Sequence, residues 1–149
     1  MDLENIALTQ LRCFASFLNY DLFQINIVSD PSCRCGANRE DSYHFFFDCY
    51  HYENMRYTLF HNLSWLPNDC AIDLKLLTSG NPILSNEQNE VIFKHVFEYI
   101  KRSKRFLAEV VHQVNNHTHH HHQPSLSLSL SLSNSFLRSL FLFNLHILM

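Results

Sequence analysis

Three cysteines and one histidine in a window of seventeen residues constrain the fold of this chain more than any other feature. Cys33, Cys35, His44 and Cys49 occur in the order Cys-x-Cys, eight residues, His-x4-Cys. Three thiolates and one imidazole are the number and kind of ligands that a closed tetrahedral Zn²⁺ site requires. Because side chains would fill all four positions, none remains for water. The pattern therefore predicts a structural zinc ion and not a catalytic one.

Gly36 directly follows the Cys-x-Cys pair. A glycine there lets the backbone fold back, so that amide N–H groups can point at thiolate sulfur. Two other interpretations of the cluster stay open, buried free thiols and, as a weaker rival, a disulfide. The odd number of cysteines, five, suits a reducing compartment better than a disulfide framework. Cys13 and Cys70, outside the window, are expected to be ordinary core residues.

The first residues, Met1 to Asn5, are acidic and do not resemble a secretory signal. We therefore expect an intracellular protein, in the nucleus or the cytoplasm, and not a secreted one. The apolar segment 136–149 is short and contains Arg138, Asn144 and His146, so we expect no membrane span.

The composition favours helices. Two glycines and four prolines in 149 residues are few for an all-β protein, whose turns need them. We expect one mainly α domain, a small helical module with a zinc knuckle at residues 4–114. Hydrophobic periodicity and capping residues predict helices at 4–19, around His44, at 50–62, at 73–78 before Gly80, and from a Ser85–Gln88 capping box to about Gln113.

Two details concern the helix that carries His44. Asp41 or Ser42 can cap it. His44 and Cys49 are five residues apart, which is about 140° around an unbroken α-helix. The backbone is therefore expected to deviate before Cys49 if both residues bind one ion.

Residues 115–149 differ sharply from the rest of the chain. Thr118 is followed by four histidines, and serine and leucine alternate strictly from Ser125 to Ser133. A TC repeat in DNA encodes Ser-Leu and an AC repeat encodes Thr and His, which suggests translated simple-sequence DNA. A loose metal-binding tract or an unpaired strand are the competing interpretations. We expect this low-complexity tail to be disordered.

Lys101, Arg102, Lys104 and Arg105 place four cations in five residues near the end of the last predicted helix. Three interpretations stay open: a solvated helix end, contact with phosphates, and a nuclear-localisation signal. With a net charge of −3, any nucleic-acid binding must come from such a local patch. Tyr43 or Tyr50 could add base stacking, although we expect both rings in the core.

Together these residues resemble the C-terminal region of reverse transcriptases from non-LTR (LINE-type, jockey-like) retrotransposons, over roughly residues 8–107. In that family the region is taken to be a nucleic-acid-binding zinc module behind the polymerase, which implies that Cys33, Cys35, His44 and Cys49 are zinc ligands. The resemblance is carried by Leu11 to Phe23, by the Cys-x-Cys-Gly, Glu-Asp, His and Cys motif within Pro31 to Cys49, and by Val96 to Phe106.

The chain also departs from that family. Tyr50 stands where the family has proline after the last cysteine. The Tyr/Phe-x-Asp-Asp run that carries two-metal phosphoryl transfer is missing, and 149 residues cannot hold the polymerase fold. We therefore expect a non-catalytic remnant of an RNA-directed DNA polymerase that binds RNA or single-stranded DNA. A zinc-supported protein-interaction module and a fragment without function are the alternatives.

Overall fold

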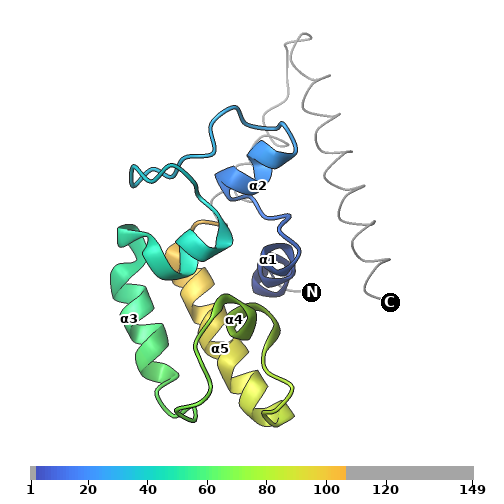
Figure 1. Cartoon of the computed structure of the whole chain (residues 1–149), viewed down its shortest axis with the longest axis vertical. Coiled ribbons are helices and arrows are strands. Elements are labelled where there is room, and N and C mark those ends of the chain that lie inside the picture. Colours follow the sequence, from blue (N-terminus) through green and yellow to red (C-terminus); the bar gives the residue numbers. More distant parts are fainter. Residues whose placement is uncertain (1–2, 107–149) are drawn as a thin grey trace, which may run out of the picture. The chain divides into compact units, whose positions relative to one another are not determined.

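The computed structural model describes residues 3–106, and the segment 107–149, which includes the predicted disordered tail, lies outside the described residues. Within the described range every regular element is helical and no strand occurs, which confirms the mainly α prediction (Figure 1). The elements are α1 (Leu3–Arg12), α2 (Asn19–Gln24), the π-helix η1 (His44–Asp48), the 3₁₀-helix η2 (Tyr50–Tyr52), α3 (Glu53–Asn62), α4 (Leu74–Ser79) and α5 (Asn86–Ser103).

Helix α5 is the central element of the core. It contacts α3 on one side and α1 and α4 on the other (Figure 1). Its buried residues Ile92, Val96, Tyr99 and Ile100 recur at helical spacing and form one stripe. Burying each such side chain contributes about 1.5–3 kcal/mol, so this stripe is a substantial part of the fold's apolar stabilisation.

The segment that carries His44 is built into the same core. Phe45 and Phe46, which follow His44, are 1% and 0% exposed. Their ring centroids lie 5.2 and 5.4 Å from that of Tyr99 on α5. The position of His44 is therefore set by aromatic packing against α5 and not by a surface loop.

The N-terminal helix is shorter than predicted. A single helix over 4–19 was expected, but α1 ends at Arg12, Phe14 has a left-handed φ of 53°, and α2 begins at Asn19. The buried carboxylate of Asp21 accepts hydrogen bonds from the backbone N–H and the hydroxyl of Ser16. These bonds, formed across the break, stabilise the connection in place of a continued helix.

The last helix starts where predicted and ends before its predicted limit, of which residues 107–113 lie outside the described range. The Ser85–Gln88 capping box is present, which confirms that prediction. The helix was expected to reach Gln113, but α5 ends at Ser103 and Lys104 adopts a left-handed φ of 55°. The chain turns here because the next residue, Arg105, reaches back to Glu40.

The predictions for the two middle helices are confirmed. Segment 50–62 forms η2 followed by α3, and 73–78 corresponds to α4. Asp73 caps α4 by accepting from the Leu76 N–H at 2.8 Å. Gly80 ends the helix with a φ of 74°, a conformation that favours glycine.

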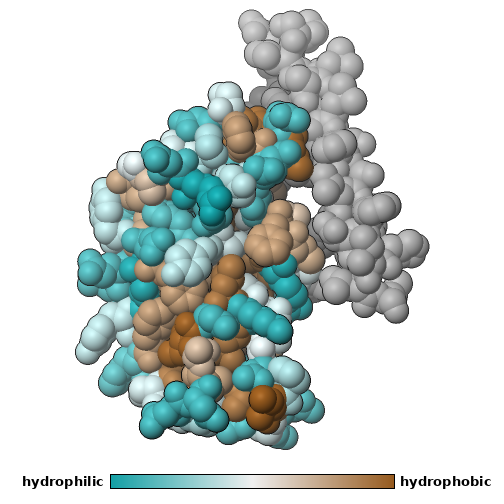
Figure 2. Space-filling model, in the orientation of Figure 1, coloured by the Kyte–Doolittle hydropathy of each residue, from teal (hydrophilic) through white to brown (hydrophobic). Residues whose placement is uncertain are grey.

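One face of the molecule carries mostly polar residues, and hydrophobic residues gather where α3 and α5 lie side by side (Figure 2). A small pocket between the two helices has Met55 and Thr58 from α3 and His95 and Arg102 from α5 among its lining residues. Between residues 3 and 106, no helix is both long enough and apolar enough to cross a bilayer.

Candidate metal centre

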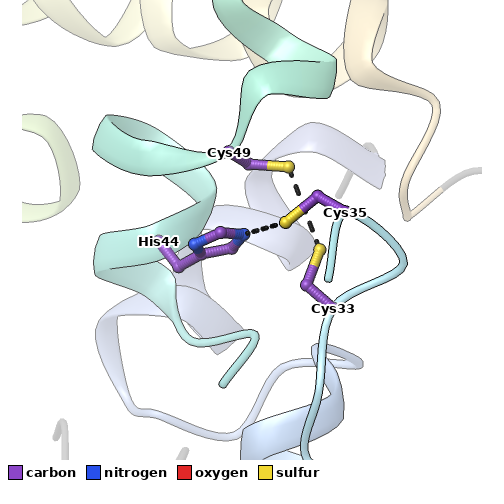
Figure 3. A group of neighbouring side chains, drawn as sticks. All are labelled: Cys33, Cys35, His44 and Cys49. Atoms are coloured by element: carbon purple, nitrogen blue, oxygen red, sulfur yellow. Dashed lines mark hydrogen bonds between the residues drawn. The ribbon is translucent and has the colours of Figure 1, made fainter. Parts of the chain in front are cut away.

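The four residues singled out from the sequence lie together. One ligand atom from each of Cys33, Cys35, His44 and Cys49 falls within 4.8 Å of the other three. Cys33 and Cys35 come from the loop after α2, His44 is the first residue of η1, and Cys49 directly follows η1. Their side chains point toward one another (Figure 3). The structure therefore assembles a group that can hold a metal ion.

Two distances within the cluster test how well it fits one ion. The Sγ atoms of Cys33 and Cys49 lie 3.9 Å apart, and the Cys35 Sγ lies 3.3 Å from the His44 Nε2 (Figure 3). Zinc–sulfur and zinc–nitrogen bonds arranged as a tetrahedron put ligand atoms about 3.6–3.8 Å apart. A disulfide would need about 2.05 Å, and all five cysteines are free, contrary to the disulfide interpretation.

A π turn explains how His44 and Cys49, five residues apart, can face one ion. The Cys49 N–H donates to the His44 carbonyl at 2.9 Å, a bond across five residues. The turn starts at a cap, because the Asp41 carboxylate accepts from the His44 N–H at 2.8 Å. The predicted backbone deviation before Cys49 is confirmed. Of the two predicted caps, Asp41 and Ser42, the structure has Asp41.

Each thiol of the cluster accepts a backbone N–H from two residues further along the chain. Ala37 donates to the Sγ of Cys35 at 3.5 Å, and Cys35 and His51 donate to Cys33 and Cys49. Gly36 allows the first of these turns with a φ of 98°, as predicted. Such N–H donors stabilise negative charge on sulfur and orient the sulfur lone pairs.

Without a bound cation, burial disfavours negative charge on the cysteine sulfurs. Burial raises the pKa of the Cys33 thiol to about 12, and burial likewise raises the pKa of the Cys49 thiol. Both thiols are therefore neutral at pH 7 unless a positive ion replaces their protons. A largely buried set of three sulfurs and one imidazole fits a thiophilic metal ion, whose binding would release these protons.

The structure divides the four basic residues at the end of α5. Lys101, Arg102 and Lys104 are exposed. Arg105 is not, because its guanidinium donates to both carboxylate oxygens of Glu40 at 2.8 and 2.9 Å. The exposed fractions of these two side chains are 16% and 5%. Arg105 is therefore a largely covered structural cation. Of the four residues predicted to contact phosphates, the other three remain available.

The sequence did not predict the structural role of Glu40. Besides Arg105 it accepts from the backbone N–H of Asn19 at 2.8 Å, and Arg105 also donates to the Phe17 carbonyl at 2.9 Å. This ion pair joins the end of α5 to the start of α2 and to the loop of the metal cluster. No local pattern reveals a pair that is 65 residues apart in the chain.

The expected burial of Tyr43 and Tyr50 is wrong, since their exposed fractions are 54% and 62%. Tyr43 stacks on the ring of Phe47 with centroids 4.9 Å apart, and Tyr50 lies against His51. Phe45 and Phe46, which lie between the two tyrosines in the sequence, fill the core instead. Two aromatic rings are thus presented to solvent on either side of the π turn.

Comparison with known proteins gives no assignment: no protein-family model, no curated protein and no solved structure matches the chain.

Proposed function

We propose that the chain is a non-catalytic, zinc-stapled helical module that binds RNA or single-stranded DNA. By its resemblance to the C-terminal region of non-LTR retrotransposon reverse transcriptases, it is a remnant of that polymerase without the catalytic domain. The observation that carries the proposal is the approach of four ligand atoms to within 4.8 Å in the Cys33, Cys35, His44 and Cys49 cluster.

In this proposal zinc has a structural role. Zinc is the usual partner of three thiolates and an imidazole in a closed site. When bound, the ion holds the Cys33–Cys35 loop against the π turn and neutralises the thiolate charge. Structural zinc sites of this size contribute about 10–16 kcal/mol of binding free energy, most of which is folding free energy.

The nucleic-acid surface comprises the end of α5 and the exposed tyrosines. Lys101, Arg102 and Lys104 contact phosphates, since they are exposed, and Tyr43 and Tyr50 stack on bases. Stacking on an aromatic side chain contributes about 1–3 kcal/mol per base without sequence preference. This division of roles suits single strands, whose bases are unpaired.

The zinc content of the full chain, purified without an added His-tag, tests the structural site. We expect Cys49→Ser to lose one zinc per chain together with helical circular dichroism. Cys13→Ser is the matched control, because Cys13 is a cysteine outside the cluster, and it should keep both. Equal zinc content and equal helicity in the two variants would overturn the metal assignment.

The salt dependence of binding to a single-stranded RNA oligonucleotide tests the partner. Each phosphate contact contributes about −0.7 to the slope of log affinity against log salt. Lys101→Gln with Lys104→Gln should therefore make the slope about 1.4 less steep. Lys75→Gln with Lys94→Gln removes the same charge from exposed positions elsewhere and should leave the slope unchanged.

If zinc-loaded protein binds no RNA or single-stranded DNA, the nucleic-acid part of the proposal fails. Salt-insensitive capture of a protein would then support the interaction-module alternative.

A further inference from the structure

The π turn that brings His44 and Cys49 together ends abruptly. At Cys49 the chain turns to an extended conformation, with φ −63° and ψ 122°. The last carbonyl groups of a helix have no N–H group ahead of them in the same helix and need donors from elsewhere. Because the surroundings of η1 are largely buried, leaving these carbonyls without donors would be costly.

Two side chains from other helices supply these donors. Arg56 on α3 donates from Nε to the Phe46 carbonyl at 2.9 Å. From Nη2 it also donates to the carbonyl of Cys49 itself, which accepts in addition from the Tyr52 N–H at 3.2 Å. Tyr99 on α5, which is 2% exposed, donates its hydroxyl to the Phe45 carbonyl. The guanidinium of Arg56 thus spans the point where the π turn stops and holds a carbonyl on each side of it.

We propose that Arg56 is a positioning residue of the metal centre, which holds the π turn in the form that directs His44 and Cys49 at one ion. The inference rests on the proposed metal binding. Arg56 suits this role because its planar guanidinium presents several N–H donors in a fixed fork, whereas lysine is a point charge on a flexible stem.

The alternative conformation of the turn shows what Arg56 prevents. Relaxation of the π turn to an ordinary α-helix would put His44 and Cys49 about 140° apart around the helix axis. The Cys49 thiol would then point away from the other three ligands. Loss of the residues that orient metal ligands typically lowers metal affinity 10–100-fold. Arg56 is therefore expected to change metal affinity and ligand geometry, beyond its effect on stability.

Titration of the full chain with Co²⁺ alone tests the inference, because the visible absorption of cobalt reports tetrahedral thiolate coordination. We expect Arg56→Met to bind Co²⁺ 10–100-fold more weakly, with a shifted visible band. Arg12→Met is the matched control: Arg12 also donates from Nε to a backbone carbonyl, that of Thr78, at 2.7 Å. It should lose stability but keep the affinity and the spectrum of the original chain.

Wild-type affinity and an unchanged spectrum in Arg56→Met would overturn the inference. If that variant does not fold, Arg56→Lys replaces it, with an expected severalfold loss of affinity and a shifted band. A lysine variant identical to the original chain would equally overturn the role of Arg56. Failure of the original chain to bind Co²⁺ at the cluster would instead contradict the proposed metal site itself.

Discussion

At the scale of single residues, polar side chains that bond to the backbone determine how this chain turns. Asp21, Asp41 and Arg56 each satisfy backbone groups where a helix starts or stops. Such groups stabilise the fold only if their hydrogen bonds outweigh the cost of removing them from water. Asp21 shows this balance most directly, since burial raises its pKa above 3.8 despite the opposing hydrogen bonds from Ser16.

We compare the free energy of unfolding of the original chain with that of the Asp21→Asn variant. We expect the difference, original minus variant, to fall as the pH rises from acid to neutral. Because the folded-state pKa of Asp21 is raised, the folded chain binds more protons than the unfolded chain above pH 3.8. The contribution of this group is full below pH 3.8 and is lost as the pH rises through the folded-state pKa. Urea unfolding of both proteins across this range measures the difference, in which the other titrating groups cancel. A difference that does not change with pH would contradict the prediction.

At the scale of elements, local signals predicted what local bonds determine. The Ser85–Gln88 capping box and the Asp73 and Gly80 ends of α4 depend on neighbouring residues. The deviation before Cys49 was predictable from the His44–Cys49 spacing, although residues of α3 and α5 also hold it. The four residues of the metal cluster were recognisable because ligand type and spacing lie within seventeen residues.

The errors have a different origin. The apolar spacing over 4–19 suits a helix, yet Ser16 bonds to Asp21 and the Asn19 N–H bonds to Glu40, so the helix breaks. The early end of α5 likewise follows from the distant Arg105–Glu40 pair. Arg56 carries no signal at all in the sequence, because its partners are backbone carbonyls. Tertiary bonds of this kind override local propensity.

At the scale of the whole molecule, the largely buried ion pair of Glu40 and Arg105 links the metal-cluster loop to the start of α2 and to the end of α5. The pair lies between residues 17–19 near the start and the last turn of α5. A more exposed pair, Arg39 with Asp41, lies next to it in sequence, with exposed fractions of 58% and 18%. The two pairs therefore allow a comparison of the same chemistry in two environments.

We expect Glu40→Gln to lower the free energy of unfolding by about 3–5 kcal/mol, because it leaves the guanidinium of Arg105 buried without a countercharge. Arg39→Gln breaks the exposed pair and should cost about 1 kcal/mol or less. Chemical denaturation of the two variants measures both effects. Similar losses in the two would show that the burial of the Glu40 pair has no energetic consequence.

The four residues of the metal cluster lie close together in the sequence, and this affects the order in which parts of the molecule fold. Its four ligands close a loop of seventeen residues, whereas Tyr99 bonds to the Phe45 carbonyl across 54 residues and Arg105 pairs with Glu40 across 65. Closing a short loop costs less chain entropy than closing a long one. During synthesis all four residues are added to the chain before α5 begins. With the proposed ion bound, the loop of the four residues would therefore close first and offer a formed surface on which α5 docks.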